Sequence, residues 1–93
     1  MDITISGAGY VGLVTAAVFA DLGNNVICLD NDHEKINNLK EGILPIYEPG
    51  LDEMVQKNYE SGRMSFTIDY KPAVQRSEII FIAVGTPPGG NGE

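Results

Sequence analysis

The run "DITIS" at residues 2–6 alternates apolar and polar residues, a period typical of a β-strand, and Gly7 ends it. Residues 10–22 are nearly all apolar, which predicts a helix that is buried on most of its surface and ends at Gly23. A second run rich in β-branched residues, "NVICLD" at residues 25–30, follows directly. The pattern therefore predicts a strand, a helix and a second strand.

The next segment predicts two helices separated by an extended connector. Asn31 and Glu34 have the spacing of a capping box, so a helix capped by Asn31 and ending near Glu41 is expected. The run "ILPIYEP" at residues 43–49 contains two prolines, which favour extended backbone. Apolar residues return at helical spacing over residues 51–59, with acidic residues in the first turn, where the helix dipole favours them.

The last part of the chain predicts two more strands around a short helix. "MSFTI" at residues 64–68 predicts a strand, Asp69 is a candidate helix cap, and "EIIFIAV" at residues 78–84 is typical of a central parallel strand covered on both faces. The alternation of strands and helices predicts an α/β fold, a Rossmann-type doubly wound parallel sheet with strand order 3-2-1-4. Only the first half of such a sheet is expected here, because the outer edge of the fourth strand has no predicted partner.

Composition and charge narrow the possible functions. The 93 residues include 13 acidic and 6 basic side chains, and the net charge of −7 opposes binding to nucleic acid or to an anionic membrane. The apolar run at residues 11–22 is too short to span a bilayer, and no Lys or Arg precedes it as in a signal peptide. Cys28, the single cysteine, cannot form an internal disulfide, so a reduced, cytoplasmic setting is expected.

The segment "ISGAGYVG" places Gly7, Gly9 and Gly12 in a G-x-G-x-x-G pattern between a predicted strand and a predicted helix. The first glycine permits a sharp turn, the second lets a pyrophosphate approach the backbone, and the third lets the helix pack closely on the sheet. The helix N-terminus adds free N–H groups and a partial positive charge. Asp30 ends the second strand, eighteen residues after Gly12, so the whole pattern predicts a dinucleotide site rather than a plain structural turn.

Asp30 also predicts which dinucleotide binds. Its carboxylate can accept the hydroxyl groups of an adenosine ribose, whereas a 2′-phosphate about 4 Å away would be repelled by about 4 kcal/mol per charge pair at an effective dielectric constant near 20. The next residues, Asn31 and Asp32, provide no positive charge. NAD is therefore the expected cofactor, in preference to NADP.

Two residues near this predicted site each have two interpretations. Lys35 either reaches the same ribose or is an ordinary solvated lysine, and Thr86 either faces the ligand crevice or is a turn residue before two prolines. His33 has no second histidine and no nearby cysteine, so it is expected at a solvated helix start, and no metal site is predicted. Cys28 is expected to be a buried structural residue.

Longer segments resemble one enzyme family. "ISGAGYVGLVTAAVFADLGNNVICLD" at residues 5–30, "PIYEPGL" at residues 45–51 and "FIAVGTPP" at residues 81–88 closely resemble the amino-terminal part of the UDP-glucose/GDP-mannose dehydrogenase family, and the resemblance covers the whole chain. The tyrosine of "IYEPGL" and the double proline of "GTPP" favour the UDP-glucose 6-dehydrogenases within it. From its position alone, "PIYEPGL" is a connector that aims a helix, with Tyr47 expected to pack against the fold.

The resemblance implies an oxidoreductase that converts UDP-glucose to UDP-glucuronate with two NAD⁺, through an aldehyde and a cysteine thioester. Its catalytic cysteine and lysine lie in a later part of the family's sequence, so no catalytic residue is assigned here. The implied cofactor-binding residues are Gly7, Gly9, Tyr10, Val11 and Gly12 around the pyrophosphate, Asp30 and Lys35 on the adenosine ribose, and Thr86 near the nicotinamide. Residues 1–93 are thus expected to form an incomplete N-terminal NAD-binding Rossmann domain, inactive alone, with the remaining strands and the substrate domain outside this chain and a homo-oligomer as the full-length form.

Two alternatives remain open from the sequence. A sibling dehydrogenase would act on GDP-mannose or UDP-N-acetylmannosamine instead of UDP-glucose. A non-catalytic Rossmann module would bind a dinucleotide without turning over any sugar, and as a natural module it would be a stable monomer or a defined dimer.

Overall fold

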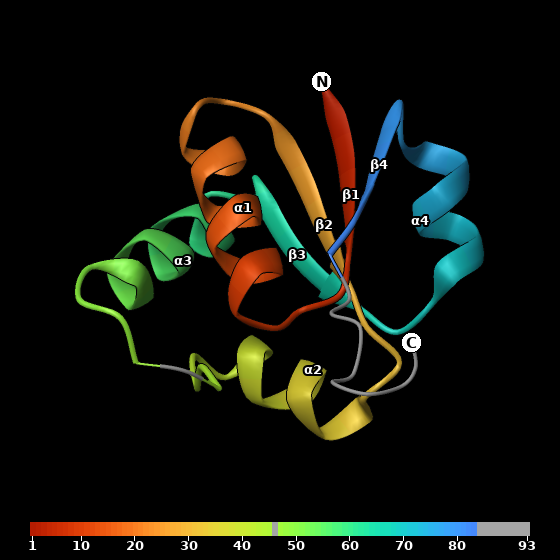
Figure 1. Ribbon diagram of the computed structural model, residues 1–93. Helices are drawn as coiled ribbons and strands as arrows, with labels where there is room; N and C mark the ends of the chain where they lie inside the picture. The colour runs from red at the N-terminus through yellow and green to blue at the C-terminus, as the bar shows by residue number, and fades with distance from the viewer. Residues whose placement is uncertain (46, 84–93) are drawn as a thin grey trace.

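The computed structural model describes residues 1–45 and 47–83, which form a four-stranded parallel sheet with helices on both faces (Figure 1). The elements are, in chain order, β1 (Asp2–Ser6), α1 (Tyr10–Asp21), β2 (Asn25–Leu29), α2 (His33–Lys40), α3 (Leu51–Glu60), β3 (Met64–Thr67), α4 (Tyr70–Arg76) and β4 (Ile79–Ile82). The strands lie in the order β3-β2-β1-β4, and the neighbouring strands are parallel. The predicted fold class and strand order are confirmed.

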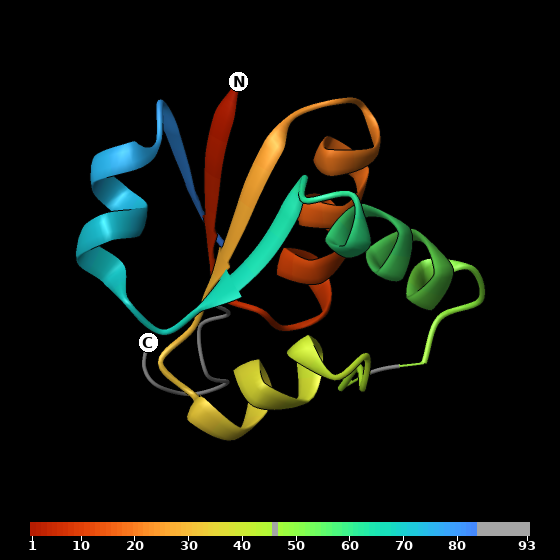
Figure 2. The same cartoon turned by 180° about the vertical axis from the view of Figure 1, so that it is seen from behind.

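The two faces of the sheet carry different helices. Ile3 and Ile5 of β1 belong to the core that includes α1, whereas Thr4 between them has its Oγ1 atom 3.3 Å from the carbonyl oxygen of Ala73 in α4, to which it donates. Figure 1 and Figure 2 show α1 and α3 on one side of the sheet and α4 on the other. The chain adds β2 and β3 on one side of β1 and then crosses over to place β4 on the other side of β1. Because crossovers between parallel strands are right-handed, this change of side moves the connecting helix α4 to the opposite face of the sheet.

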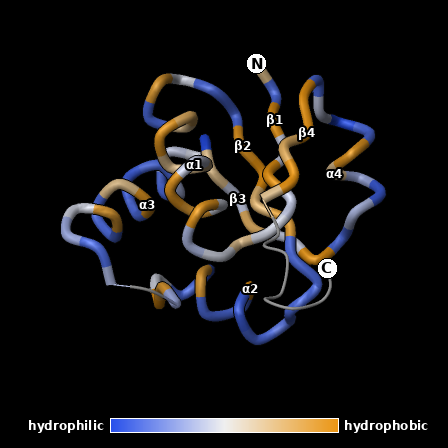
Figure 3. The backbone as a smooth tube through the Cα atoms, viewed as in Figure 1, coloured by the Kyte–Doolittle hydropathy of each residue, from blue (hydrophilic) through white to orange (hydrophobic). Residues whose placement is uncertain are grey.

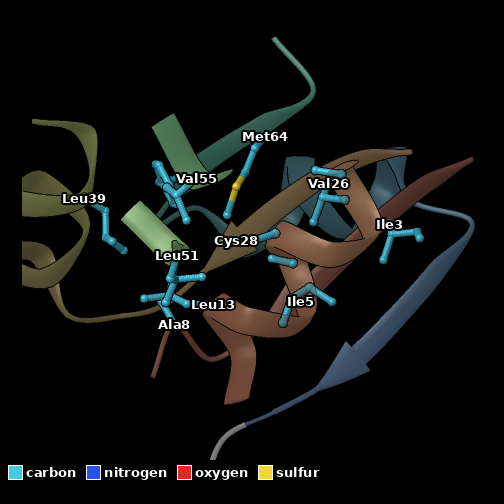
Figure 4. Packing of buried hydrophobic residues seen from close by; sticks show 14 of the residues in the cluster. Ile3, Ile5, Ala8, Leu13, Val26, Cys28, Leu39, Leu51, Val55 and Met64 are labelled. Carbon is cyan, nitrogen blue, oxygen red and sulfur yellow. The ribbon is translucent and has the colours of Figure 1, made fainter. Parts of the chain in front are cut away.

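The main core lies between the sheet and helices α1, α2 and α3 (Figure 4). Ile5 and Leu13 are completely buried there, and burial of one such side chain contributes about 1.5–3 kcal/mol to folding. Figure 3 shows the apolar residues gathered in α1 and the strands, while α2 is largely hydrophilic. Successive side chains of β1 thus point to opposite faces of the sheet, with Ile3 and Ile5 toward the main core and Thr4 toward α4.

One prediction about burial is confirmed and one is wrong. Most residues of α1 are buried or partly buried, as predicted, although Tyr10, Val11 and Val18 are 51%, 61% and 44% exposed. The prediction that β4 is covered on both faces is wrong, because each of its residues, Ile79–Ile82, is exposed by 37% or more. Among the described residues, β4 pairs with β1 only, so its outer edge and much of its two faces have no packing partner there.

Three local predictions also need correction. Helix α2 is capped by Asp32 rather than Asn31, because Asp32 has the extended backbone of a cap and its carboxylate accepts the N–H of Lys35 at 3.1 Å. Asp69 occupies the N-cap position of α4, but its side chain makes no capping hydrogen bond. Tyr47 is 88% exposed, so it does not pack against the fold.

Candidate functional site

The glycine turn, residues 7–9, connects β1 to α1 at the carboxyl end of the strand. Gly7 has a φ of +113°, in the region that favours glycine, and its N–H donates to the Leu29 carbonyl oxygen at 2.7 Å. The side chain of Ala8 is fully buried in the core, beside Leu13 (Figure 4). The turn is therefore fixed by a bond to the end of β2 and by core packing.

Gly12 lies in the first turn of α1, directly against the glycine turn. A β-carbon at this position would lie 1.7 Å from the carbonyl oxygen of Gly7, far below the 3.0 Å under which real β-carbons essentially never approach another atom. Gly12 is also buried. Only glycine allows the helix to approach the turn this closely.

Helix α1 begins with an open N-terminus. Gly9 is its N-cap, no side chain caps the helix, and its first turn contains no acidic residue. A β-carbon on Gly9 would meet no atom within 4 Å, so the packing of the fold does not require a glycine there. Tyr10 and Val11 are exposed, and the first N–H groups of any α-helix lack partners within the helix. These groups and the helix dipole can hold an anion.

Asp30 follows β2 and lies beside the glycine turn. Its Oδ2 atom accepts the N–H of Ala8 at 2.9 Å, and its Oδ1 atom accepts the N–H of Asp32, also at 2.9 Å. Ala8 and Asp30 are 22 positions apart in the sequence. The parallel pairing of β1 with β2 thus brings an acidic side chain to the helix N-terminus that follows β1.

The environment of Asp30 favours its ionised form. Partial burial by itself would raise the pKa of this carboxyl, but the N–H groups of Ala8 and Asp32, together with the charge of Lys35, outweigh burial and lower the pKa below its ordinary value of 3.8. Asp30 is therefore a carboxylate at neutral pH. A carboxylate can accept two ribose hydroxyls and repels a 2′-phosphate.

Lys35 lies in the first turn of α2 and pairs with Asp30. Its Nζ atom is 3.4 Å from Asp30 Oδ2, and its side chain is 29% exposed. The structure thus brings Lys35 within reach of any group that binds to the Asp30 carboxylate. Thr86, the other residue with two interpretations, lies outside the described residues.

Sequence reasoning missed one feature of this site, the N–H of Ala8. No residue pattern could reveal it, because every residue except proline carries the same backbone donor. A separate open hollow of about 590 Å³ lies at the carboxyl ends of β2 and β3, and none of the candidate site residues that the structure describes lines it. Its lining residues are Asn31, Ile68, Asp69, Tyr70, Lys71 and Pro72.

His33 and Cys28, the other two residues considered from the sequence, lie outside the candidate site. His33 is the exposed first residue of α2, and Cys28 is completely buried in β2, where burial raises the pKa of its thiol to about 12. In residues 1–45 and 47–83, no three side chains of His, Cys, Asp or Glu gather as metal ligands would. None of the helices described is both long enough and apolar enough to cross a membrane.

The sequence of this chain matches a family model over its full length. Residues 1–93 match the "UDP-glucose/GDP-mannose dehydrogenase family, NAD binding domain". The chain belongs to this dehydrogenase family. The cofactor of this dehydrogenase domain is therefore NAD.

Named members of the dehydrogenase family resemble the chain closely. UDP-glucose 6-dehydrogenase of Rhizobium meliloti (strain 1021) is 58% identical over 94% of the chain and 20% of its own length. UDP-glucose 6-dehydrogenase TuaD of Bacillus subtilis (strain 168) is 52% identical over 98% of the chain and 20% of its own length. The crystal structure of a ternary complex of GDP-mannose dehydrogenase from Pseudomonas aeruginosa has a TM-score of 0.92 and 44% identity, over 100% of the chain and 21% of that protein. The chain spans about a fifth of the length of these relatives.

The site geometry fits the dehydrogenase cofactor. The open N-terminus of α1 can bind a pyrophosphate, and the space beside Gly9 leaves the backbone accessible to it. The ionised carboxylate of Asp30 lies at hydrogen-bonding distance from the same turn, where it can accept hydroxyl groups. Both requirements of an adenosine diphosphate moiety are therefore met by residues of this chain.

Proposed function

We propose that NAD binds with its pyrophosphate on the glycine turn and the first turn of α1, and with its adenosine ribose on Asp30. The observation that carries this proposal is the 2.9 Å hydrogen bond from the Ala8 N–H to Asp30 Oδ2. This bond places a ribose acceptor directly beside an anion-binding helix N-terminus, and in NAD the ribose and the pyrophosphate are directly linked. The proposed contacts are Gly7, Gly9, Tyr10, Val11 and Gly12 at the pyrophosphate, Asp30 and Lys35 at the ribose, and Thr86 toward the nicotinamide.

Gly9, Tyr10, Val11 and Lys35 have separate roles in the proposed complex. Gly9 leaves room for the phosphate oxygens, while Tyr10 and Val11 contribute backbone N–H donors at the exposed start of α1. Lys35 donates to the ribose and offsets the charge of Asp30, since the two groups already form an ion pair. The residues of this chain thus bind and orient the cofactor.

We further propose that the chain is the NAD-binding part of a UDP-glucose 6-dehydrogenase. The proposal is supported by two relatives of that name at 58% and 52% identity, compared with 44% for the GDP-mannose dehydrogenase structure. In the proposed reaction, UDP-glucose, two NAD⁺ and water give UDP-glucuronate, two NADH and three protons. Bound NAD supplies the hydride acceptor in both oxidation steps.

The nucleophile of this reaction is not among the residues assigned here. Cys28 is buried in β2 with a pKa of about 12, which is the opposite of an activated thiolate. We therefore assign the thioester-forming cysteine and the catalytic lysine to parts of the protein other than residues 1–93. Residues 1–93 alone are expected not to oxidise substrate.

The test is the ratio of NADH formed to UDP-glucose consumed by the protein expressed from its complete gene. Two NADH per sugar is the expected result, because each oxidation transfers one hydride. A ratio of one would contradict the double oxidation while supporting a dehydrogenase. No NADH from any nucleotide sugar, with NAD still bound, would favour the non-catalytic Rossmann module.

A sibling activity is the second candidate, and it rests on the close structural match to GDP-mannose dehydrogenase. GDP-mannose and UDP-N-acetylmannosamine are therefore assayed alongside UDP-glucose at equal concentrations. Comparison of kcat/KM for the three sugars decides among them, since this ratio measures discrimination between substrates. A higher kcat/KM for either alternative sugar would replace the proposed substrate without affecting the assignment of the cofactor.

A further inference from the structure

The Asp30 carboxylate connects segments that lie far apart in the sequence. Its Oδ2 atom accepts the Ala8 N–H of the turn after β1, and its Oδ1 atom accepts the Asp32 N–H of the turn after β2. Lys35 of α2 adds an ion pair to Oδ2 at 3.4 Å. A carboxylate has about four acceptor sites, so the two backbone N–H groups leave about two for ribose hydroxyls once the 3.4 Å contact of Lys35 is released. Asp30 therefore has a role in the protein itself besides any contact with a ligand.

The Ala8 N–H lies at the centre of the glycine turn, so its bond to Asp30 acts on the shape of that turn. Ala8 lies between Gly7 and Gly9, and glycine has the greatest backbone freedom of any residue. The bond from the Gly7 N–H to the Leu29 carbonyl oxygen holds one end of the turn. The bond to Asp30 holds its centre and is charge-assisted, which makes it stronger than a bond between neutral groups.

We propose that Asp30 is a positioning residue for the pyrophosphate: through the Ala8 N–H it holds the glycine turn in the shape that presents the N–H groups of α1 to the phosphates. This inference deepens the proposed NAD site and rests on the proposed placement of the cofactor. It separates two effects of one side chain, a direct contact with the ribose and an indirect effect on the binding of phosphate. The second effect should persist for a ligand that has no ribose hydroxyls.

The experiment compares ADP with 2′,3′-dideoxy-ADP, which carries the same base and the same phosphates but lacks both hydroxyls. Affinities are measured for the protein expressed from its complete gene, unmodified and as Asp30→Asn. We expect Asp30→Asn to weaken binding of 2′,3′-dideoxy-ADP by about five- to tenfold, because the charge-assisted bond from the Ala8 N–H is replaced by a weaker bond to a neutral amide oxygen. Loss of one negative charge alone would strengthen the binding of an anion, so a decrease in affinity cannot arise from net charge.

Asp69→Asn is the matched control. Asp69 follows the neighbouring strand β3 and makes no side-chain capping bond, and its substitution removes the same charge. This control is expected to bind 2′,3′-dideoxy-ADP no more weakly than the unmodified protein. Hydrogen–deuterium exchange of the peptide containing Ala8 gives an independent measurement, and in ligand-free Asp30→Asn this peptide should exchange faster.

The outcomes are distinguishable. If Asp30→Asn weakens ADP binding but leaves 2′,3′-dideoxy-ADP binding unchanged, Asp30 acts on the ribose only and the positioning role is overturned. If the unmodified protein binds neither ADP nor 2′,3′-dideoxy-ADP, the placement of NAD itself is wrong. Should Asp30→Asn fail to fold, Asp30→Glu replaces it, because this variant keeps the charge and displaces the carboxylate from the Ala8 N–H. Unchanged binding of 2′,3′-dideoxy-ADP by Asp30→Glu would likewise overturn the inference.

Discussion

The carbonyl oxygen of Gly7 occupies the space that a β-carbon of Gly12 would need, 1.7 Å from its ideal position. Gly7 begins the glycine turn, and Gly12 lies in the first turn of α1, so this close approach sets the distance between the turn and the helix. The same distance determines where the first N–H groups of α1 lie relative to the backbone of the turn. In the proposed NAD site, stability and cofactor binding are therefore expected to depend on one close approach.

Gly12→Ala is expected to destabilise the protein. The added methyl group overlaps a backbone oxygen that cannot rotate away, and overpacking of this kind costs about 1–3 kcal/mol. NAD affinity should fall as well, because the helix must move away from the turn. Urea unfolding gives the change in the free energy of unfolding, and calorimetric titration gives the change in affinity. Wild-type stability in this variant would contradict the close packing.

Gly9→Ala is the matched variant, with the same added atom at a position where it meets nothing within 4 Å. Gly9 has a φ of −81°, which alanine adopts without strain, so the free energy of unfolding should change by less than about 1 kcal/mol. The methyl group lies on the proposed path of the pyrophosphate, and we expect NAD affinity to fall by at least about tenfold. Unchanged NAD binding in a stable Gly9→Ala protein would contradict the proposed placement of the pyrophosphate on this turn.

Asp30→Ala tests the choice between NAD and NADP. Loss of the carboxylate removes hydrogen bonds to a charged group, which are worth about 1.5–3 kcal/mol each, so NAD affinity should fall by about ten- to a hundredfold. NADP affinity should fall less or rise, because repulsion of the 2′-phosphate disappears as well. Dissociation constants for both cofactors in both proteins give the ratio directly. Equal affinity of the unmodified protein for NAD and NADP would contradict this role of Asp30.

The strand order could be predicted from the sequence because it depends on patterns that are local and strong. Alternation in residues 2–6 and the β-branched run at residues 25–30 define two parallel strands, and right-handed crossovers leave few arrangements for the rest. The cap of α2 was mistaken because Asn31 and Asp32 are both good capping residues. The choice between them depends on backbone angles, and these are set by the end of β2.

The candidate site was only partly predictable for a related reason. The spacing of the glycines and of Asp30 indicates a dinucleotide site, because side chains or their absence carry that information. The bond from the Ala8 N–H to Asp30 joins a backbone group to a side chain 22 positions away, and only the register of β1 against β2 creates it. The predicted strand order already leaves the outer edge of β4 unpaired, but the exposure of its faces could not be predicted, since an apolar run has the same appearance whether or not another element covers it.

Cys28 is expected to be unreactive in the folded protein. Its complete burial raises the pKa of the thiol to about 12, so almost no thiolate is present at neutral pH. Peptide-level mass spectrometry after iodoacetamide treatment should find Cys28 unmodified in the native protein and alkylated in concentrated urea. Cys28→Ala should leave the NADH yield per UDP-glucose unchanged, because Cys28 is not the nucleophile. A lost second oxidation in that variant would contradict this assignment.

Asp21, at the C-terminal end of α1, is expected to make the free energy of unfolding depend on pH in the acid range. Asp21 pairs with Lys57 at 2.6 Å and accepts a hydrogen bond from Asn58 at 3.3 Å, and these two contacts lower the pKa of Asp21 below 3.8 despite some opposing burial. Asn58 is completely buried and also accepts the Nε–H of Arg63 at 3.1 Å. The carboxylate thus belongs to a connected polar cluster between α1, α3 and the start of β3.

The sign of the pH effect follows from the lowered pKa of Asp21. In the unfolded chain the carboxyl has its ordinary pKa, so as the pH falls the unfolded state binds the proton first, and unfolding is favoured. The stabilisation from this group is complete above the ordinary pKa of 3.8 and is lost as the pH falls through the lower folded pKa. Urea unfolding near pH 7 and at about pH 3 should show a smaller acid-induced loss of stability in Asp21→Asn than in the unmodified protein.

Glu41→Gln is the control, because it removes an exposed carboxylate that forms no ion pair within residues 1–45 and 47–83. An equal effect of both substitutions would attribute the pH dependence to net charge rather than to the Asp21–Lys57–Asn58 contacts.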